Sequence, residues 1–235
     1  MKLLWTVLLC SAVPAMAAEP FTGIWKMDAS TLRFSNKPIR YELANGTYKC
    51  LDCDPPVVVK ADGTDQPVAG QPAYDTMSVR IIDDHTIEVV TKKAGRPYLD
   101  SKRTVAPDGR TATNVFTRYP ESGNKPFTIT ATFRRVGGIV AGAHAFSGSW
   151  VQEKAETVSE HALLVTYAET ADGLKMSTET GEHYDARFDG KEYPYEGDPR
   201  LNRVVLRRID PQTIEEVQKD SSLLGMGCIC VRSVR

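Results

Sequence analysis

Apolar and polar residues alternate with a period of two in several parts of the chain, which is the pattern of half-buried β-strands. Residues 127–134 alternate between Phe, Ile or Ala at one position and Thr or Arg at the next. Residues 77–81 and 87–89 show the same period on either side of an Asp83-Asp84 turn. We find no convincing amphipathic helix. The pattern predicts an all-β protein.

Turn signals punctuate these segments at intervals of ten to twenty residues. Asn-Gly and Asp-Gly dipeptides favour β-hairpins because the tight turns need positive φ angles. They occur at Asn45-Gly46, Asp62-Gly63, Asp108-Gly109, Asp172-Gly173 and Asp189-Gly190. We therefore expect antiparallel meanders, and we favour closed barrels because closure removes exposed strand edges.

The chain contains an internal repeat. A shift of 127 residues lays 41–93 over 168–220 without a gap, and 16 of the 53 positions are identical. Upstream, Gly23-Ile24-Trp25 matches Gly148-Ser149-Trp150 at a shift of 125. The repeat predicts a first β domain at 18–136, a glycine-rich linker at 137–144 and a second β domain at 145–235.

The second copy is predicted to be incomplete. Residues 104–135 of the first copy supply a turn and at least two strands, for which the second copy has no counterpart. The segment 221–235, with Cys228 and Cys230, does not resemble the corresponding part of the first copy. We favour a truncated reading frame, and a genuinely divergent tail is the alternative. We expect residues 18–140 to fold alone and residues 141–235 to be less stable.

The Gly-x-Trp motif ahead of each meander resembles the lipocalin-like, or calycin, barrels. The resemblance rests on Gly23, Trp25, Gly148 and Trp150. It implies two tandem lipocalin-like barrels in which each Trp closes one barrel end. The pattern Cys-x-x-Cys-x-Pro-Pro, Lys-Ala-Asp-Gly, Tyr-Asp-Thr and Thr-Ile-Glu, between 50 and 88, is similar to that of a group of exported bacterial proteins. That second resemblance implies no activity.

The N-terminus carries the three parts of a secretory signal peptide. Lys2 is followed by an apolar stretch, and Ala15-Met16-Ala17 presents small residues at the positions that signal peptidase recognises. We expect residues 1–17 to be removed, Ala18 to begin the mature chain, and the product to be periplasmic or secreted. The alternative of a lipid-modified Cys10 is disfavoured because Leu8-Leu9 stand where small residues belong.

The pair Cys50 and Cys53 is open to three interpretations: a disulfide, half of a metal site or a redox centre. A redox pair needs a helix N-terminus to lower the thiol pKa, and Pro55-Pro56 follow instead. A zinc site needs two more ligands at suitable spacing. In an oxidising compartment we favour a local disulfide across a turn.

No combination of residues points to catalysis, a metal or a cofactor. The four histidines share no spacing, the Asp83-Asp84 and Glu88/Glu215 carboxylates fit surface turns and strands, and no serine elbow or phosphate-binding glycine pattern occurs. A Gly/Pro loop recurs in both copies near three tyrosines. We favour a simple turn there, and a ligand site is the alternative; its candidate residues, together with the two motif tryptophans, are Trp25, Tyr74, Trp150, Tyr193 and Tyr195.

Net charge and hydropathy exclude some classes of binding partner. The net charge is −1 and no basic block occurs, which argues against nucleic acid. After the signal peptide no segment is long and apolar enough to span a bilayer. We expect a non-enzymatic exported protein that binds a small apolar or amphipathic molecule or an envelope protein. The alternatives are a hydrolase using carboxylates, or a purely structural or interaction module.

Overall fold

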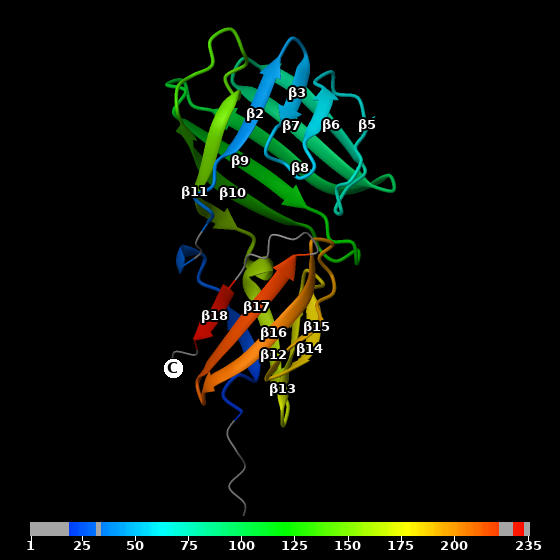
Figure 1. Cartoon of the computed structure of the whole chain (residues 1–235), viewed down its shortest axis with the longest axis vertical. Helices are drawn as coiled ribbons and strands as arrows, with labels where there is room; N and C mark the ends of the chain where they lie inside the picture. Colours follow the sequence, from blue (N-terminus) through cyan, green and yellow to red (C-terminus); the bar gives the residue numbers. More distant parts are fainter. Residues whose placement is uncertain (1–18, 32–33, 221–227, 233–235) are drawn as a thin grey trace, which may run out of the picture.

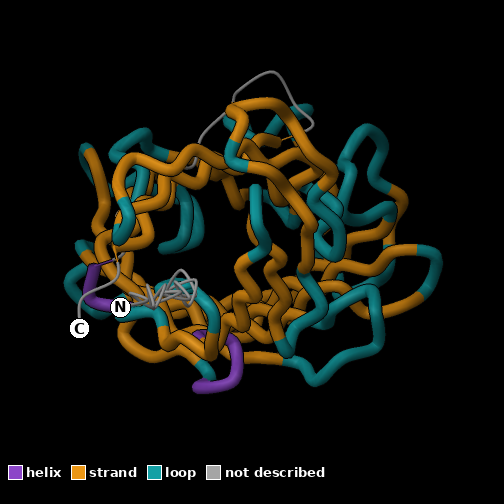
Figure 2. Tube along the Cα trace, turned by 90° about the horizontal axis from the view of Figure 1, so that it is seen from below, coloured by secondary structure: helices purple, strands orange, loops and turns teal. Residues whose placement is uncertain are grey.

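The computed structural model describes residues 19–31, 34–220 and 228–232. These residues form an antiparallel all-β protein with two short 3-10 helices, η1 (Ala29–Thr31) and η2 (Glu160–Leu163), so the all-β prediction is confirmed. Two β bodies follow one another along the long axis (Figure 1), and seen along that axis the strands run around the rim of the molecule (Figure 2). The expected signal peptide and residues 221–227 and 233–235 lie outside the described residues.

The first body is one ten-stranded sheet that curls into a nearly closed barrel. Its strand order is β4-β3-β2-β11-β10-β9-β8-β7-β6-β5. An isolated bridge joins Asp62, just after the end strand β4, to Arg80 of β6, the second strand from the other end. The strands are β2 (Ile39–Ala44), β3 (Thr47–Cys50), β4 (Val57–Lys60), β5 (Gln66–Pro67), β6 (Thr76–Asp83), β7 (Thr86–Lys93), β8 (Arg96–Val105), β9 (Thr111–Arg118), β10 (Phe127–Val136) and β11 (Gly148–Val158).

The second body consists of two four-stranded sheets that pack against each other. One has the order β1-β12-β13-β14 and the other β15-β16-β17-β18. Their strands are β1 (Gly23–Lys26), β12 (Leu164–Glu169), β13 (Gly173–Thr178), β14 (His183–Arg187), β15 (Asp189–Pro194), β16 (Leu201–Asp210), β17 (Thr213–Asp220) and β18 (Cys228–Arg232). Within the described ranges, no strands stand where β9 and β10 stand in the first body.

The two Gly-x-Trp strands are exchanged between the bodies. β1 precedes the first body in sequence but pairs with β12, with Gly23 opposite Tyr167. β11 begins the second copy but closes the first body by pairing with β10 on one side and β2 on the other, where Gly148 lies opposite Tyr41. In Figure 1, β1 is the blue strand of the lower body and β11 lies beside β2 in the upper one. Each body therefore contains a strand from the other half of the chain.

Glycine is required where each exchanged strand begins. Gly23 and Gly148 have φ angles of 142° and 132°, a region that residues with a Cβ rarely adopt. A Cβ on Gly148 would lie 2.3 Å from a guanidinium nitrogen of Arg135. The glycine thus lets Arg135 reach the start of β11.

Two of the five expected hairpin turns are not hairpins. The dipeptides at 45–46, 108–109 and 172–173 connect paired strands, as predicted. Asp62-Gly63 and Asp189-Gly190 instead stand where the chain leaves one sheet edge for another, because β4 does not pair with β5, nor β14 with β15. Gly63 packs on Arg80, and Gly190 packs on Arg207. At both places the positive φ serves a turn between consecutive strands that do not pair.

Each body has its own apolar core. The first core is built around Leu43, Tyr48, Val79, Ile87 and Val89, and β11 adds Trp150. The second is built around Leu174, Tyr184, Val204, Leu206 and Ile214, and the segment before β1 adds Phe21.

Candidate ligand-binding site

A charged side chain crosses the interior of the first body. Arg103 lies on β8, and its Nη1 donates to the hydroxyl of Tyr48 on β3 at 3.1 Å. Since β8 and β3 are five places apart in the sheet, this contact joins opposite walls. Tyr48 is only 2% exposed, whereas Arg103 is partly exposed. The guanidinium therefore lies inside the curled sheet and keeps some access to solvent.

The neighbours of Arg103 are polar but uncharged, or aromatic. Its Nε donates to Ser101 Oγ at 3.2 Å, and Ser101 donates to Asn114 Oδ1 at 2.7 Å. The guanidinium carbon lies 5.5 Å from the ring centre of Tyr41 and 5.3 Å from that of Phe146. Such distances allow cation–π attraction.

Arg103 has no acidic partner among the described residues. No ion pair includes it, and its hydrogen bonds within this part of the chain occupy only Nε and one terminal nitrogen of a group that carries five N–H donors. A buried charge is normally matched by an opposite charge, because removing it from water is costly. In the described part of the chain, the positive charge of Arg103 is therefore not neutralised by a carboxylate, and some of its N–H groups remain free to donate.

The surrounding phenols stay neutral. Burial raises the pKa of Tyr48 above its ordinary value, and burial raises the pKa of Tyr74 to about 12. Neither can become an anion beside Arg103 at physiological pH. The phenols consequently do not neutralise the positive charge of Arg103.

The second body contains a buried acid instead. Glu216 on β17 is 3% exposed, and its Oε2 accepts hydrogen bonds from Tyr184 at 2.8 Å and Tyr167 at 3.3 Å. Gln218 donates to Oε1 at 2.8 Å. Burial raises the pKa of Glu216. With both oxygens engaged, this carboxyl ties β17 to the opposite sheet rather than offering a binding site.

The two bodies meet at a buried arginine, Arg118. Arg118, at the end of β9, lies with its guanidinium carbon 3.9 Å from the ring centre of Tyr98. Its Nη2 is 3.8 Å from Asp198, in the loop between β15 and β16. The Tyr98 hydroxyl and Arg118 Nε are buried with no partner in the described part of the chain. Asn124 of the first body also donates to the carbonyl of Glu179.

The five residues proposed from sequence for ligand contact divide between the bodies. Tyr74 and Trp150 pack in or against the first core, and Trp150 is 2% exposed. Trp25, Tyr193 and Tyr195 belong to or pack on the second core, where Tyr195 lies 6.2 Å from Tyr184. They do not form one cluster, and their role in binding stays a prediction. Arg103 was not predicted as a site residue from the sequence. The sequence shows only that an arginine stands in a segment that also contains residues typical of a buried strand.

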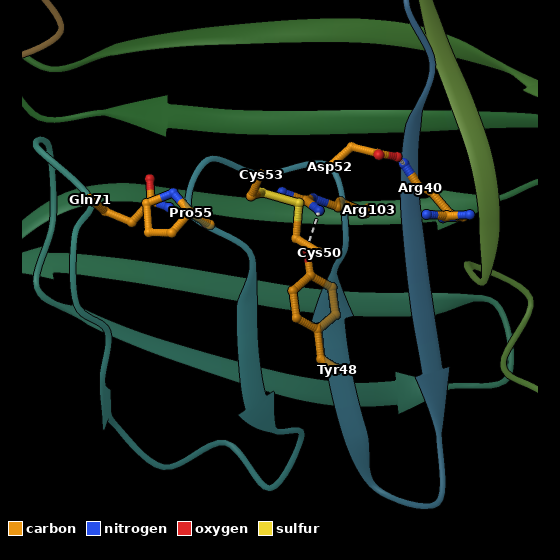
Figure 3. Close-up of a disulfide and its surroundings, with 8 residues drawn as sticks. All are labelled: Arg40, Tyr48, Cys50, Asp52, Cys53, Pro55, Gln71 and Arg103. Carbon is orange, nitrogen blue, oxygen red and sulfur yellow. Dashed lines mark hydrogen bonds between the residues drawn. A yellow bond between two sulfur atoms is a disulfide. The ribbon is translucent and has the colours of Figure 1, made fainter. Parts of the chain in front are cut away.

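Cys50 and Cys53 form the predicted disulfide in the connection from β3 to β4. Figure 3 shows it beside Tyr48 and Arg103, with Pro55 following on the far side. Asp52, between the two cysteines, accepts the backbone N–H of Arg40 at 2.9 Å, and Gln71 donates to the carbonyl of Pro55. The disulfide thus fixes a loop that covers the tyrosine end of the Arg103 site.

The histidines and carboxylates considered for catalysis do not assemble into a reactive set. His85 and His144 line one pocket with Asp84 and the apolar residues 139–141. However, His144 Nε2 contacts the carbonyl of Asp83 at 2.7 Å, and its Nδ1 accepts the N–H of Phe146 at 3.1 Å, so neither ring nitrogen is free. Glu88 and Glu215 pair with Arg80 and Arg207. Within the described ranges no three metal-ligating side chains gather.

The chain was compared with known proteins in three ways. No protein-family model, curated protein or solved structure matches it. Among the described residues no helix has the length and apolar character needed to cross a membrane.

Proposed function

We propose that this chain is an exported binding protein with two lipocalin-like β bodies, and that the first, a nearly closed barrel, holds a small amphipathic molecule by its acidic group. The acidic group pairs with Arg103, and the apolar part lies against the interior of the curled sheet. The observation that carries the proposal is the absence of an acidic partner for Arg103 in the described residues.

The chemistry of the site favours a carboxylate or another oxyanion. Arg103 presents a planar fork of donors that fits two oxygens at once. Ser101 and Tyr48, which already contact the guanidinium, supply further hydroxyl groups. The aromatic rings of Tyr41 and Phe146 and the core around Ile87 supply the apolar wall. A purely apolar ligand would leave the cation unpaired.

Export is part of the proposal. Residues 1–17 have the organisation of a signal peptide, and the Cys50–Cys53 disulfide suits an oxidising compartment. N-terminal sequencing of the protein recovered from the exported fraction should begin at Ala18. A chain that begins at a lipid-modified Cys10, or that stays in the cytoplasm with its N-terminus intact, contradicts it.

A ligand series of equal chain length tests the binding chemistry. Calorimetric titration should show that a medium- or long-chain fatty acid binds, and that the corresponding alcohol and amine bind at least tenfold more weakly. A hydrogen bond to a charged group contributes about 1.5–3 kcal/mol, and about 1.4 kcal/mol corresponds to a factor of ten. Equal affinity for acid, alcohol and amine would contradict the proposal.

Matched variants separate the site from general effects. Arg103→Met removes the charge and keeps the length of the side chain, so it should abolish the preference for the acid. Arg134→Met makes the same change on the outer surface of β10, where Arg134 pairs with Glu153, and should leave binding unchanged. Arg103→Lys should restore part of the preference. Circular dichroism of each variant checks that the sheet is retained.

A further inference from the structure

The two motif tryptophans are covered to different degrees. Trp150 lies opposite Arg135 of β10 in the ladder, and the Arg135 guanidinium carbon is 4.2 Å from its ring centre. Arg135 also donates to the carbonyls of Gly109, Ala145 and Ser147. As a result Trp150 is 2% exposed. Trp25 occupies the same position of the motif in the second body but is only partly buried.

Trp25 is less buried than Trp150 because the order of the strands differs between the two bodies. β11 lies between β2 and β10, whereas β1 pairs with β12 on one side and is otherwise an edge strand within the described residues. In the first body β10 and β9 stand between β11 and β8. In the second body that place, between β1 and β18, is occupied by no described strand. Ile24, next to Trp25, is 74% exposed.

The backbone of β1 is oriented to accept a further strand. The N–H of Met27 donates to the carbonyl of Leu163, and hydrogen-bonded pairs alternate along an antiparallel ladder. Trp25 therefore faces β12 with its backbone groups, and Ile24 and Lys26 direct theirs to the open edge. Unpaired groups of this kind are where extended peptides add to a sheet.

We propose that the open edge of β1 binds an extended segment of a partner polypeptide, antiparallel to β1, with an arginine opposite Trp25. The first body shows the chemistry of such a segment, because β10 covers β11 in this way with Arg135 opposite Trp150. The carbonyls of Pro20 and Thr22 correspond, at the motif shift of 125, to those of Ala145 and Ser147 that receive the guanidinium of Arg135. The proposal is independent of the ligand proposed for Arg103.

The probe is a synthetic peptide with the sequence of β10, residues 127–136, carrying a short lysine tag for solubility. We expect it to bind the full-length protein and to slow amide exchange at Ile24 and Lys26, which should exchange quickly in the free protein. A peptide with Arg135→Ala should bind at least fivefold more weakly, because the cation–π contact and the contacts to the carbonyls are both lost.

A pair of protein variants isolates the edge. Ile24→Pro removes one outward N–H, which an edge strand tolerates, and should reduce peptide affinity at least tenfold. Ile24→Thr keeps that N–H and should bind like the natural protein. The proposal is overturned if the peptide does not bind, if Ile24→Pro binds it equally well, or if the amides of Ile24 and Lys26 are already protected in the free protein. Protection that appears only on dimerisation would assign the edge to a second copy and would also overturn it.

Discussion

Trp25 and Trp150 make the same contact in opposite bodies. Each indole N–H donates to the carbonyl four residues earlier, Trp25 to Phe21 at 2.8 Å and Trp150 to Phe146 at 2.9 Å. Each tryptophan belongs by sequence to one copy of the repeat and packs on the core built mainly by the other. The exchange ties the two halves of the chain together more tightly than a linker alone.

Cutting the chain between residues 140 and 141, in the connection from β10 to β11, should therefore unfold both halves. Fragment 18–140 lacks β11, and with it Phe146, Trp150 and Val151; fragment 141–235 lacks β1 and Phe21. Burial of each large apolar side chain contributes about 1.5–3 kcal/mol, so the loss approaches the roughly 5–15 kcal/mol that holds a domain together. Neither fragment alone should show a cooperative thermal transition by circular dichroism. That result would contradict the expectation from sequence that the first fragment folds alone, which stays a prediction.

Mixing the two fragments provides the control. The fragments should restore one cooperative transition and form a one-to-one complex in native mass spectrometry, because each then supplies the strand that the other lacks. A sharp transition for fragment 18–140 by itself would show that β11 is dispensable and that the exchange does not stabilise the fold.

The sequence predicted the strands well and the pairing between copies poorly. The alternating segments at 127–134 and on either side of the Asp83-Asp84 turn form β10, β6 and β7 in the structure. A Gly-x-Trp strand, however, encodes which face is buried and not which of two similar cores accepts it. Because both cores present a tyrosine opposite the glycine, Tyr41 or Tyr167, local pattern could not decide between them.

The ungapped alignment also hid a one-residue slip. A shift of 127 matches Tyr41 with Ala168, whereas the structure places Tyr41 and Tyr167 equivalently, each opposite a motif glycine. In a strand a slip of one residue exchanges the two faces. The same shift is correct for β4 and β14, where Val57 and Tyr184 are both buried. The extra residue therefore lies in the connection that carries the disulfide in the first copy.

The Arg103 site could not be predicted from sequence because its parts are distant along the chain. Tyr48 and Arg103 are 55 residues apart and meet only when the sheet curls. Nothing in the local pattern distinguishes Arg103 from Arg96, which is exposed at the start of the same strand. The Cys50–Cys53 disulfide was predictable because its three-residue spacing and the two prolines that follow define a turn locally.

Glu216 should make stability depend on pH. Its folded pKa is raised above the unfolded value of about 4.3, so its contribution is fully present below that value and is lost as pH rises through the folded pKa. Urea unfolding of Glu216→Gln should show a flatter profile than the natural protein from mildly acidic to neutral pH. Glu153→Gln, on the surface of β11, should keep the natural profile; an unchanged profile in Glu216→Gln would contradict the assignment.

Tyr184 should stabilise the second body through the same carboxyl. Tyr184→Phe removes the 2.8 Å bond to Glu216 and leaves the ring in place, so unfolding free energy should fall by about 1.5–3 kcal/mol. Tyr193→Phe removes an exposed hydroxyl bonded to Asp189 and should change stability far less. Equal effects of the two substitutions would show that the buried network adds nothing.

The disulfide should have a modest structural effect. It closes a loop with a sequence separation of 3, for which the chain-entropy relation gives about 2 kcal/mol. Cys50→Ala with Cys53→Ala should lower the unfolding free energy by about that amount and leave the fold intact. Disulfide reductase activity in the natural protein that disappears in this variant would show a redox role instead.

Native mass spectrometry of the protein purified from the exported fraction tests the central claim most directly. If the first barrel binds an acidic amphipathic molecule at Arg103, the natural protein and Arg134→Met should retain a bound small molecule that ionises as an acid after release. Arg103→Met should be free of it. A natural protein without any bound molecule that also fails to take up added fatty acid, or an Arg103→Met variant that carries the same molecule, would contradict the account.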